Sequence, residues 1–189
     1  NSIKATSVVA LGGTNLTNDI AIGLRTPNHE AEKIKRQYGC AASALVGADE
    51  MIRVPGVGGR EPRELSRRVL TDIIEPRMVE IFMLARQEIE LSGYLNQLAS
   101  GIVLTGGAAQ LDGIVEVAQE VFELPVRLGV PKGVVGLADL VDSPQYATVV
   151  GLVRHGLQNA HGGGRPTLKG RDLFEKVAAR MRGWIRDFF

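Results

Sequence analysis

Cysteines, aromatic residues and long apolar runs are all scarce in this chain. Cys40 is the one cysteine among 189 residues, and aromatic residues make up 5% of the sequence. No internal disulfide can form, so a reducing compartment fits the composition. No apolar run approaches the roughly 18 residues that suggest a membrane-spanning helix, and we expect no secretory signal. Because the first residue is Asn1 rather than Met, we expect a cut product or a piece of a longer protein.

The chain also lacks a charge excess and the motifs of several common enzyme classes. Its formal net charge is +1, so we expect no strong whole-chain attraction to nucleic acid. There is no P-loop, no zinc-ligand spacing, no HExxH and no GxSxG. The three histidines are scattered at His29, His155 and His161. The sequence therefore predicts neither a catalytic pair nor a metal site.

The residue patterns that are present alternate between strands and helices. Apolar and β-branched runs predict strands at 3–11, 51–54, 101–105, 126–128 and 134–135. Helical spacing of apolar residues predicts helices at 14–24, 27–38, 61–92, 111–122 and 144–157, the last as a core helix. Pro76 lies inside the longest helix, so we expect a break or kink near Glu75. This alternation is typical of an α/β fold.

A glycine pair, Gly106-Gly107, separates strand 101–105 from a helix that we expect to start near Leu111. Glycines at such a turn let the backbone approach a ligand closely, and the amino end of a helix favours an anion or a polar ring edge. The alternative is a tight turn with no ligand role.

A second candidate for ligand binding is the pair Glu32 and Lys35. The two residues are three positions apart, so they share one helix face. A carboxylate and an ammonium placed there could hold the two hydroxyls of a ribose. The alternative is a solvated charge pair, which is common on helices.

Five stretches of the sequence, taken together, resemble one known family. They are GGTNLTNDIAIGLRTP (12–27), EAEKIKRQYG (30–39), VPGVGGREPRELSRRVLTDIIEPR (54–77), GIVLTGGAAQLDG (101–113) and the basic amphipathic end. These segments are similar to the bacterial cell division family FtsA, an actin-like family of the actin and Hsp70 ATPase superfamily. The resemblance covers the whole chain except the loosely matching residues 159–170.

The resemblance implies a fold and a domain order. In the family two lobes close over ATP and Mg²⁺, and this chain corresponds to most of the second lobe. We expect an actin-like α/β lobe at 1–158, a flexible glycine-rich linker at 159–170 and a membrane-targeting amphipathic helix at 171–189. The residues that the resemblance assigns to nucleotide binding are Glu32, Lys35, Gly106, Gly107, Ala108 and Gln110.

One family motif is not matched. The family's phosphate loops are of the DxGxxT type, whereas Ala10-Leu11 precedes Gly12-Gly13-Thr14 here with no aspartate. Phosphoryl transfer depends on charges positioned around the phosphates. We therefore expect no ATPase activity from this chain, and weak or absent binding of ATP and Mg²⁺.

The last residues combine an apolar stripe with a basic face, which is typical of a helix that lies in a membrane interface. The apolar residues, at helical spacing, are Leu173, Phe174, Val177, Met181, Trp184, Ile185, Phe188 and Phe189. The charged residues are Lys169, Arg171, Lys176, Arg180, Arg182 and Arg186 against Asp172, Glu175 and Asp187, six minus three or +3. We expect anionic lipid as the partner; the alternative is a helix docked on its own core.

Arginines gather near the start of the longest predicted helix, at positions 60, 63, 67, 68 and 77. Arginine forks suit carboxylates, which favours an acidic peptide as a partner; a solvated face is the alternative. The resemblance implies that this lobe binds the C-terminal tail of FtsZ and contacts neighbouring subunits of an actin-like polymer. We assign Arg63 and Arg77 to the tail-binding region.

The resemblance, together with the amphipathic end, thus implies an adaptor that anchors the FtsZ ring to the cytoplasmic face of the inner membrane at the division site. Two other classes share the actin-like cleft and remain alternatives: a small-molecule kinase and a chaperone-type ATPase. Neither would carry the glycine-rich spacer and the membrane helix.

Overall fold

The protein is represented by a computed structural model that describes residues 3–55, 61–134 and 138–162. The chain divides after Thr148 into two compact units, each of which is described by itself. The predicted membrane helix at 171–189, and most of the predicted linker, lie outside the described residues.

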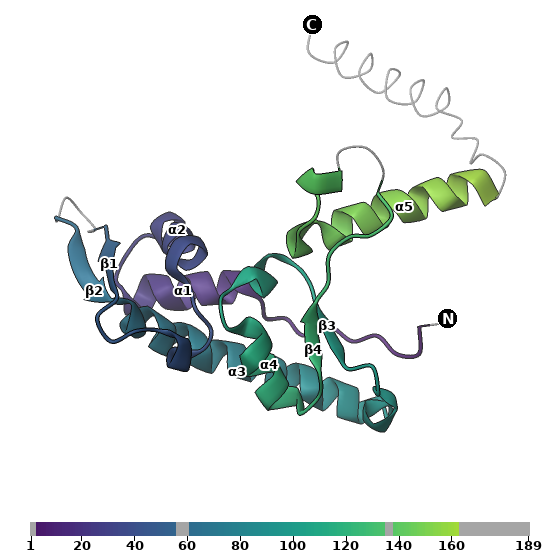
Figure 1. The fold of residues 1–189 in the computed structure, drawn as a ribbon, viewed down its shortest axis with the longest axis horizontal. Helices are drawn as coiled ribbons and strands as arrows, with labels where there is room; N and C mark the ends of the chain where they lie inside the picture. Colours follow the sequence, from purple (N-terminus) through teal and green to yellow (C-terminus); the bar gives the residue numbers. More distant parts are fainter. Residues whose placement is uncertain (1–2, 56–60, 135–137, 163–189) are drawn as a thin grey trace, which may run out of the picture. The chain divides into compact units, whose positions relative to one another are not determined.

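Four α-helices form most of the first unit (Figure 1): α1 (Gly13–Gly23), α2 (Asn28–Tyr38), α3 (Arg67–Leu91) and α4 (Ile114–Phe122). Local residues explain where they begin. The side-chain oxygen of Asn15 accepts the backbone N–H of Gly12 at 2.9 Å just before α1. Ser66 caps α3 by accepting the N–H of Arg68 at 3.3 Å. Helices α1 and α2 match the sequence predictions at 14–24 and 27–38.

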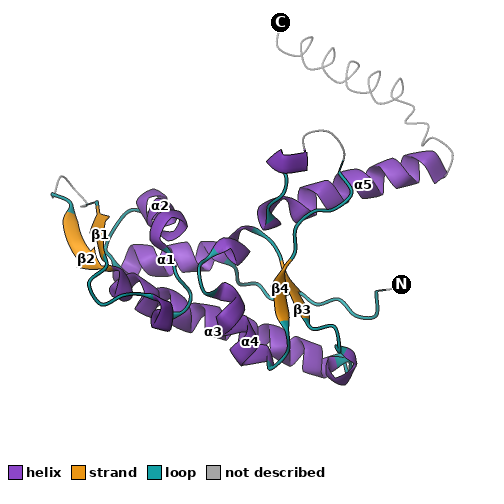
Figure 2. Ribbon diagram, in the orientation of Figure 1, coloured by secondary structure: helices purple, strands orange, loops and turns teal. Residues whose placement is uncertain are grey.

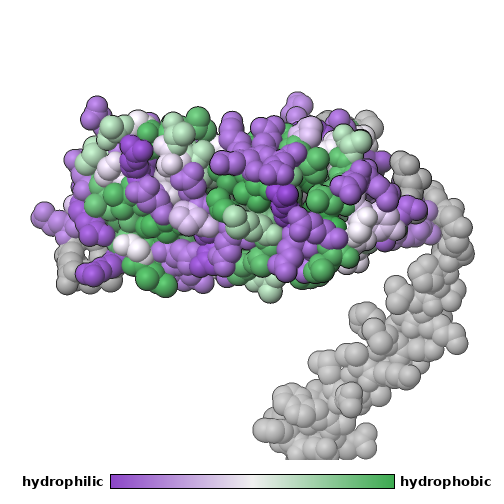
Figure 3. Space-filling model, turned by 90° about the horizontal axis from the view of Figure 1, so that it is seen from below, coloured by the Kyte–Doolittle hydropathy of each residue, from purple (hydrophilic) through white to green (hydrophobic). Residues whose placement is uncertain are grey.

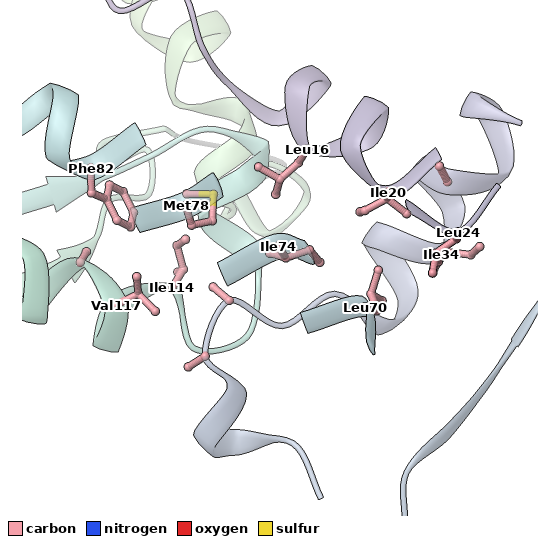
Figure 4. Close-up of a cluster of buried hydrophobic side chains, with 14 of the residues drawn as sticks. Leu16, Ile20, Leu24, Ile34, Leu70, Ile74, Met78, Phe82, Ile114 and Val117 are labelled. Atoms are coloured by element: carbon pink, nitrogen blue, oxygen red, sulfur yellow. The ribbon is translucent and has the colours of Figure 1, made fainter. Parts of the chain in front are cut away.

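The core lies where α3 meets α1 on one side and α4 on the other (Figure 4). Helical spacing places the buried side chains of each helix on one face. The labelled members are Leu16, Ile20 and Leu24 of α1, Ile34 of α2, Leu70, Ile74, Met78 and Phe82 of α3, and Ile114 and Val117 of α4. The long helix α3 therefore supports both of its neighbours.

Two short sheets complete the first unit (Figure 2). Strands β1 (Met51–Val54) and β2 (Arg63–Ser66) pair antiparallel, from Met51 opposite Ser66 to Val54 opposite Arg63. Strands β3 (Ile102–Leu104) and β4 (Val126–Leu128) pair in parallel, with Ile102 opposite Val126. The parallel pair is joined by a crossover that contains α4. The predicted α/β fold is thus confirmed.

Two of the predicted strands are wrong. Residues 3–11 form no strand, because no described strand supplies backbone partners for them, and Val8 is 91% exposed. Val134 is also outside any strand, and residue 135 lies outside the described residues. The missed strand is β2, which stands where the prediction began a helix. Its residues pair with β1, and this non-local pairing overrides their local helical pattern.

The helix predictions need three corrections. Helix α3 runs unbroken past Pro76, because buried Ile74 and Met78 hold both flanks in the core. Helix α4 starts at Ile114 rather than Leu111, after Gly113 at φ +72°. The predicted helix 144–157 divides into the 3₁₀ turn η5 (Pro144–Tyr146) and α5 (Ala147–Gly162). Helix α5 therefore includes residues 159–162, the first four of the predicted linker.

Helix α5 is not the core helix that its apolar residues predict. Val149, Leu152, Val153 and Leu157 are each more than half exposed. The remaining 3₁₀ turns are η1 (Ser43–Leu45), η2 (Leu95–Gln97), η3 (Gly107–Gln110) and η4 (Ala138–Leu140).

Some large apolar side chains also stay exposed in the first unit. Ile22 is 77% exposed and Leu91 is 74% exposed. Figure 3 shows apolar surface between polar patches on one face. A search of the described residues found no helix with the length and hydropathy to cross a membrane.

Candidate functional site

A polar cleft of about 690 Å³ lies in the first unit. Its walls come from the start of α1, from α2, from the glycine turn after β3 and from the turn η5. The lining includes Gly13, Thr14, Glu32, Lys35, Arg36, Gly107, Ala108, Gln110, Asp112 and Gln145. This volume lies within the range of small-molecule sites.

Lys35 is the organising charge of the cleft. Its residue is 8% exposed, and its Nζ donates to three oxygens: the Gly13 carbonyl at 2.9 Å, Thr17 Oγ1 at 2.8 Å and Glu32 Oε2 at 2.6 Å. A buried ammonium needs such partners, since desolvation without them is costly. Lys35 thereby joins the first turn of α1 to α2.

Glu32 is the acidic member of the pair and is more open to solvent. Its Oε2 accepts from Lys35 and also from Thr17 Oγ1 at 2.5 Å. Burial alone would raise the pKa of Glu32, but the hydrogen bonds from Lys35 and Thr17 outweigh burial and lower that pKa. Glu32 therefore stays ionised at neutral pH.

We expect this lowered pKa to make the free energy of unfolding depend on pH. A carboxylate whose pKa is depressed by folding stabilises the protein above its unfolded pKa, and the effect is lost as the pH falls through the folded pKa. Glu32→Gln should lower the free energy of unfolding at pH 7 by about 0.5 to 1 kcal/mol, because the side chain is partly solvated. Urea unfolding of both proteins at a series of pH values below 7 measures the difference, which should shrink as the pH falls.

The matched control is Glu64→Gln, on the exposed strand β2, whose carboxylate makes no ion pair among the described residues. Its effect on unfolding should be small at every pH of the series. A pH-independent loss for Glu32→Gln would contradict the assignment.

The glycine turn shapes the opposite wall. Gly106 has φ +93°, a backbone conformation that side chains disfavour. Its N–H donates to the Pro144 carbonyl at 2.9 Å, which ties η5 to the turn. A Cβ added at Gly107 would meet no atom within 4 Å, so the missing side chain leaves open space at the cleft. The expected helix amino end is absent there: the turn continues as the four-residue 3₁₀ segment η3.

The structure brings five of the six predicted nucleotide-binding residues to this one cleft. These are Glu32, Lys35, Gly107, Ala108 and Gln110; Gly106 shapes the turn beside them. Sequence reasoning missed Thr17, Arg36, Asp112 and Gln145. Thr17 had a signal that could have revealed it, because this polar residue falls on the apolar face of its helix with Ile20 and Leu24.

The two arginines assigned to partner binding lie on β2 and α3 and have internal contacts. Arg63 Nη2 donates to the Leu24 carbonyl at 2.5 Å. Arg77 pairs with Asp19 at 2.5 Å and with Glu80, and the hydrogen bond that it donates to Asp19 is the main reason that its pKa is raised. A partner carboxylate would therefore have to share these groups.

Arg67, another residue of the arginine cluster, has a structural role. Its guanidinium donates to the Tyr38 carbonyl at 2.8 Å, to Glu50 at 2.8 Å and to Asp112 at 2.9 Å. Hydrogen bonding with Glu50 is the largest contribution that raises its pKa. Arg60 lies outside the described residues.

The residues that line the cleft could hold part of a nucleotide. A carboxylate acceptor and an open glycine turn suit a ribose and a flat ring. Within residues 3–55, 61–134 and 138–162 no three His, Cys, Asp or Glu side chains are grouped so that they could hold a metal ion. The described residues of the cleft could thus hold the nucleoside part of a nucleotide.

The family model and the similar sequences all point to the same family. The family model described as "Cell division protein FtsA" matches residues 1–151. FtsA of Pseudomonas aeruginosa is 45% identical, across 100% of this chain and 46% of that protein. FtsA of Escherichia coli K12 is 41% identical across 98% and 44%, and FtsA of Bacillus subtilis is 37% identical across 86% and 36%. The chain thus spans less than half the length of these relatives.

Comparison with solved structures gives the fold. The crystal structure of MreB5 of Spiroplasma citri bound to ADP has a TM-score of 0.58 and 17% identity, across 82% of this chain and 48% of that chain. The AMPPNP-bound MreB5 has a TM-score of 0.54 at 17% identity, across 80% and 47%. The first unit therefore has a mixed α/β fold of the actin-like type.

Proposed function

Because the chain belongs to the FtsA family of cell division proteins, we propose that it is an adaptor between the division ring and the membrane. In this proposal residues 171–189 bind anionic lipid at the cytoplasmic face of the inner membrane. The first unit binds the C-terminal tail of FtsZ, with Arg63 and Arg77 in the binding region, and contacts neighbouring subunits of a polymer. Nucleic acid is not a partner.

The observation that carries the proposal is the composition of residues 171–189. In the sequence, eight large apolar residues recur at helical spacing, and the basic residues from Lys169 onward give the segment 169–189 a net charge of +3. Their burial in lipid is worth on the order of 10 kcal/mol at most, whereas the basic face adds roughly 3 kcal/mol at an anionic leaflet. The alignment with the Pseudomonas aeruginosa protein spans 100% of the chain, so it includes this segment.

Cosedimentation with vesicles tests the membrane role. With vesicles that contain anionic lipid, the intact chain should be found in the pellet, and Trp184→Glu should remain largely in the supernatant. A charge in the middle of the apolar stripe opposes its burial, which supplies the larger part of the binding energy. Higher salt should weaken the binding of the intact chain without abolishing it, because screening acts on the smaller, electrostatic part.

Glu175→Gln is the matched control, since it changes the polar face and leaves the apolar stripe intact. It should bind at least as well as the unmodified chain, because the local charge rises from +3 to +4. Equal sedimentation of Trp184→Glu and the unmodified chain would remove the membrane role.

The cleft favours a second, compatible role in nucleotide binding. In this role it holds the nucleoside part of ATP or ADP, with the base over the open space at Gly107 and the ribose at Glu32. Support comes from the cleft residues and from the fold shared with MreB5, whose structures are described as bound to ADP and AMPPNP. We propose that this chain by itself does not hydrolyse ATP, because Gly12-Gly13-Thr14 lacks the preceding aspartate of the family's phosphate loops.

A further inference from the structure

The ammonium group of Lys35 is fully occupied by the protein. It carries three N–H donors, and three protein oxygens lie within 2.6 to 2.9 Å of Nζ. No donor is left over for a ligand hydroxyl while these contacts are kept. The sequence predicts that Lys35 and Glu32 both contact the ribose. With the ammonium occupied, the carboxylate of Glu32 is the group of this pair that can contact it.

The Thr17 hydroxyl lies behind that carboxylate and completes its support. Thr17 is 7% exposed and is not part of the cleft lining. Its oxygen accepts from Lys35 at 2.8 Å and lies 2.5 Å from Glu32 Oε2 and 3.0 Å from the Gly13 carbonyl. The hydroxyl has one proton, and the ionised Glu32 is the closer and stronger acceptor. Thr17 and Lys35 thus both hold the same oxygen of Glu32.

The other carboxylate oxygen, Glu32 Oε1, has a different environment. No described residue donates a hydrogen bond to it, and Glu32 lines the cleft. A carboxylate oxygen has two lone-pair sites, so it can accept from both hydroxyls of a vicinal diol. A phosphate, which is anionic and lacks such donors at neutral pH, would be disfavoured there.

We propose that Thr17 is a positioning residue, which acts through Glu32 and leaves Oε1 as the acceptor for the ribose hydroxyls of a bound nucleotide. The proposal deepens and rests on the proposed nucleotide role of the cleft. It assigns Lys35 to the same positioning task, with no direct contact to the ligand required.

Valine and serine at position 17 separate the hydroxyl from the shape of the side chain. Thr17→Val keeps the shape and removes the hydroxyl, and Thr17→Ser keeps the hydroxyl and removes a methyl group. A ¹³C NMR titration of the Glu32 carboxyl, identified by its loss in Glu32→Gln, should show a higher pKa in Thr17→Val and a near-normal response in Thr17→Ser. The relevant charged neighbours, Lys35 and Arg36, are unchanged in both variants.

Calorimetric titration with ADP and with 2′-deoxy-ADP supplies the ligand readout. Thr17→Val should bind ADP about tenfold more weakly, a change of about 1.4 kcal/mol, and should discriminate less between the two ligands. Thr17→Ser should stay within about twofold of the unmodified chain. A general loss of structure would weaken the binding of both ligands alike. The ratio of the two affinities therefore distinguishes a positioning role of Thr17 from unfolding.

An unchanged Glu32 pKa in Thr17→Val would overturn the inference. If the valine variant folds poorly, Thr17→Ala gives the same test, because it removes both the hydroxyl and the methyl group of threonine. If the unmodified chain binds neither ligand, the nucleotide role fails, and the NMR titration still decides whether Thr17 positions Glu32.

Discussion

Gly101→Ala is expected to lower the free energy of unfolding by about 3 to 4 kcal/mol. Gly101 has φ +76°, and a Cβ there would lie 2.0 Å from the carbonyl oxygen of Pro125. That oxygen accepts the N–H of Ile102 at 2.8 Å, the first contact between β3 and β4. The backbone strain at this positive φ costs about 1 to 2 kcal/mol. The shift of neighbouring atoms that makes room for the Cβ costs about 1 to 3 kcal/mol more. Urea unfolding followed by circular dichroism measures the loss.

The matched control is Gly107→Ala, in the turn that follows β3. Its φ is not positive and its added Cβ would meet no atom within 4 Å, so the unfolding free energy should change by no more than about 0.5 kcal/mol. Equal urea midpoints for the two variants would contradict the close approach at Gly101.

Lys35→Met is expected to lower the free energy of unfolding by about 2 to 3 kcal/mol at pH 7. Methionine is of similar length, so the loss comes mainly from the three contacts of the ammonium. Removing one partner of a buried ion pair costs about 3 to 5 kcal/mol, and the value is lower here because 44% of the Glu32 side chain is exposed. Chemical unfolding at constant pH gives the difference directly.

Lys33→Met provides the comparison on the same helix. Its side chain is 68% exposed and, among the described residues, pairs with Glu30 alone, so its removal should change stability by less than about 1 kcal/mol. A loss at Lys35 no larger than the loss at Lys33 would show that the buried contacts do not stabilise the unit.

The elements that were predicted correctly are those with strong local patterns. Helix α2 begins just after Pro27 and ends before Gly39, and both signals are visible in the sequence. Strands β3 and β4 are short apolar runs bounded by turn residues. The errors at 3–11 and 63–66 have one cause: whether a segment becomes a strand depends on a partner strand, which is often distant in the chain.

The candidate site was predictable in its residue types and only partly in its geometry. The spacing of Glu32 and Lys35 places them on one helix face, as the structure confirms. The spacing contains no information on Thr17 or the Gly13 carbonyl, because the approach of α1 to α2 is a tertiary contact. The sequence therefore predicts the pair and does not reveal that the ammonium is already occupied.

Arg67 joins parts of the chain that are far apart in sequence. From the start of α3 its guanidinium reaches the end of α2, the turn before β1 and Asp112 at the edge of the cleft. Any displacement of α3 along its axis would pull on these three attachments together. The start of α3 and the rim of the cleft are thus held together by one side chain.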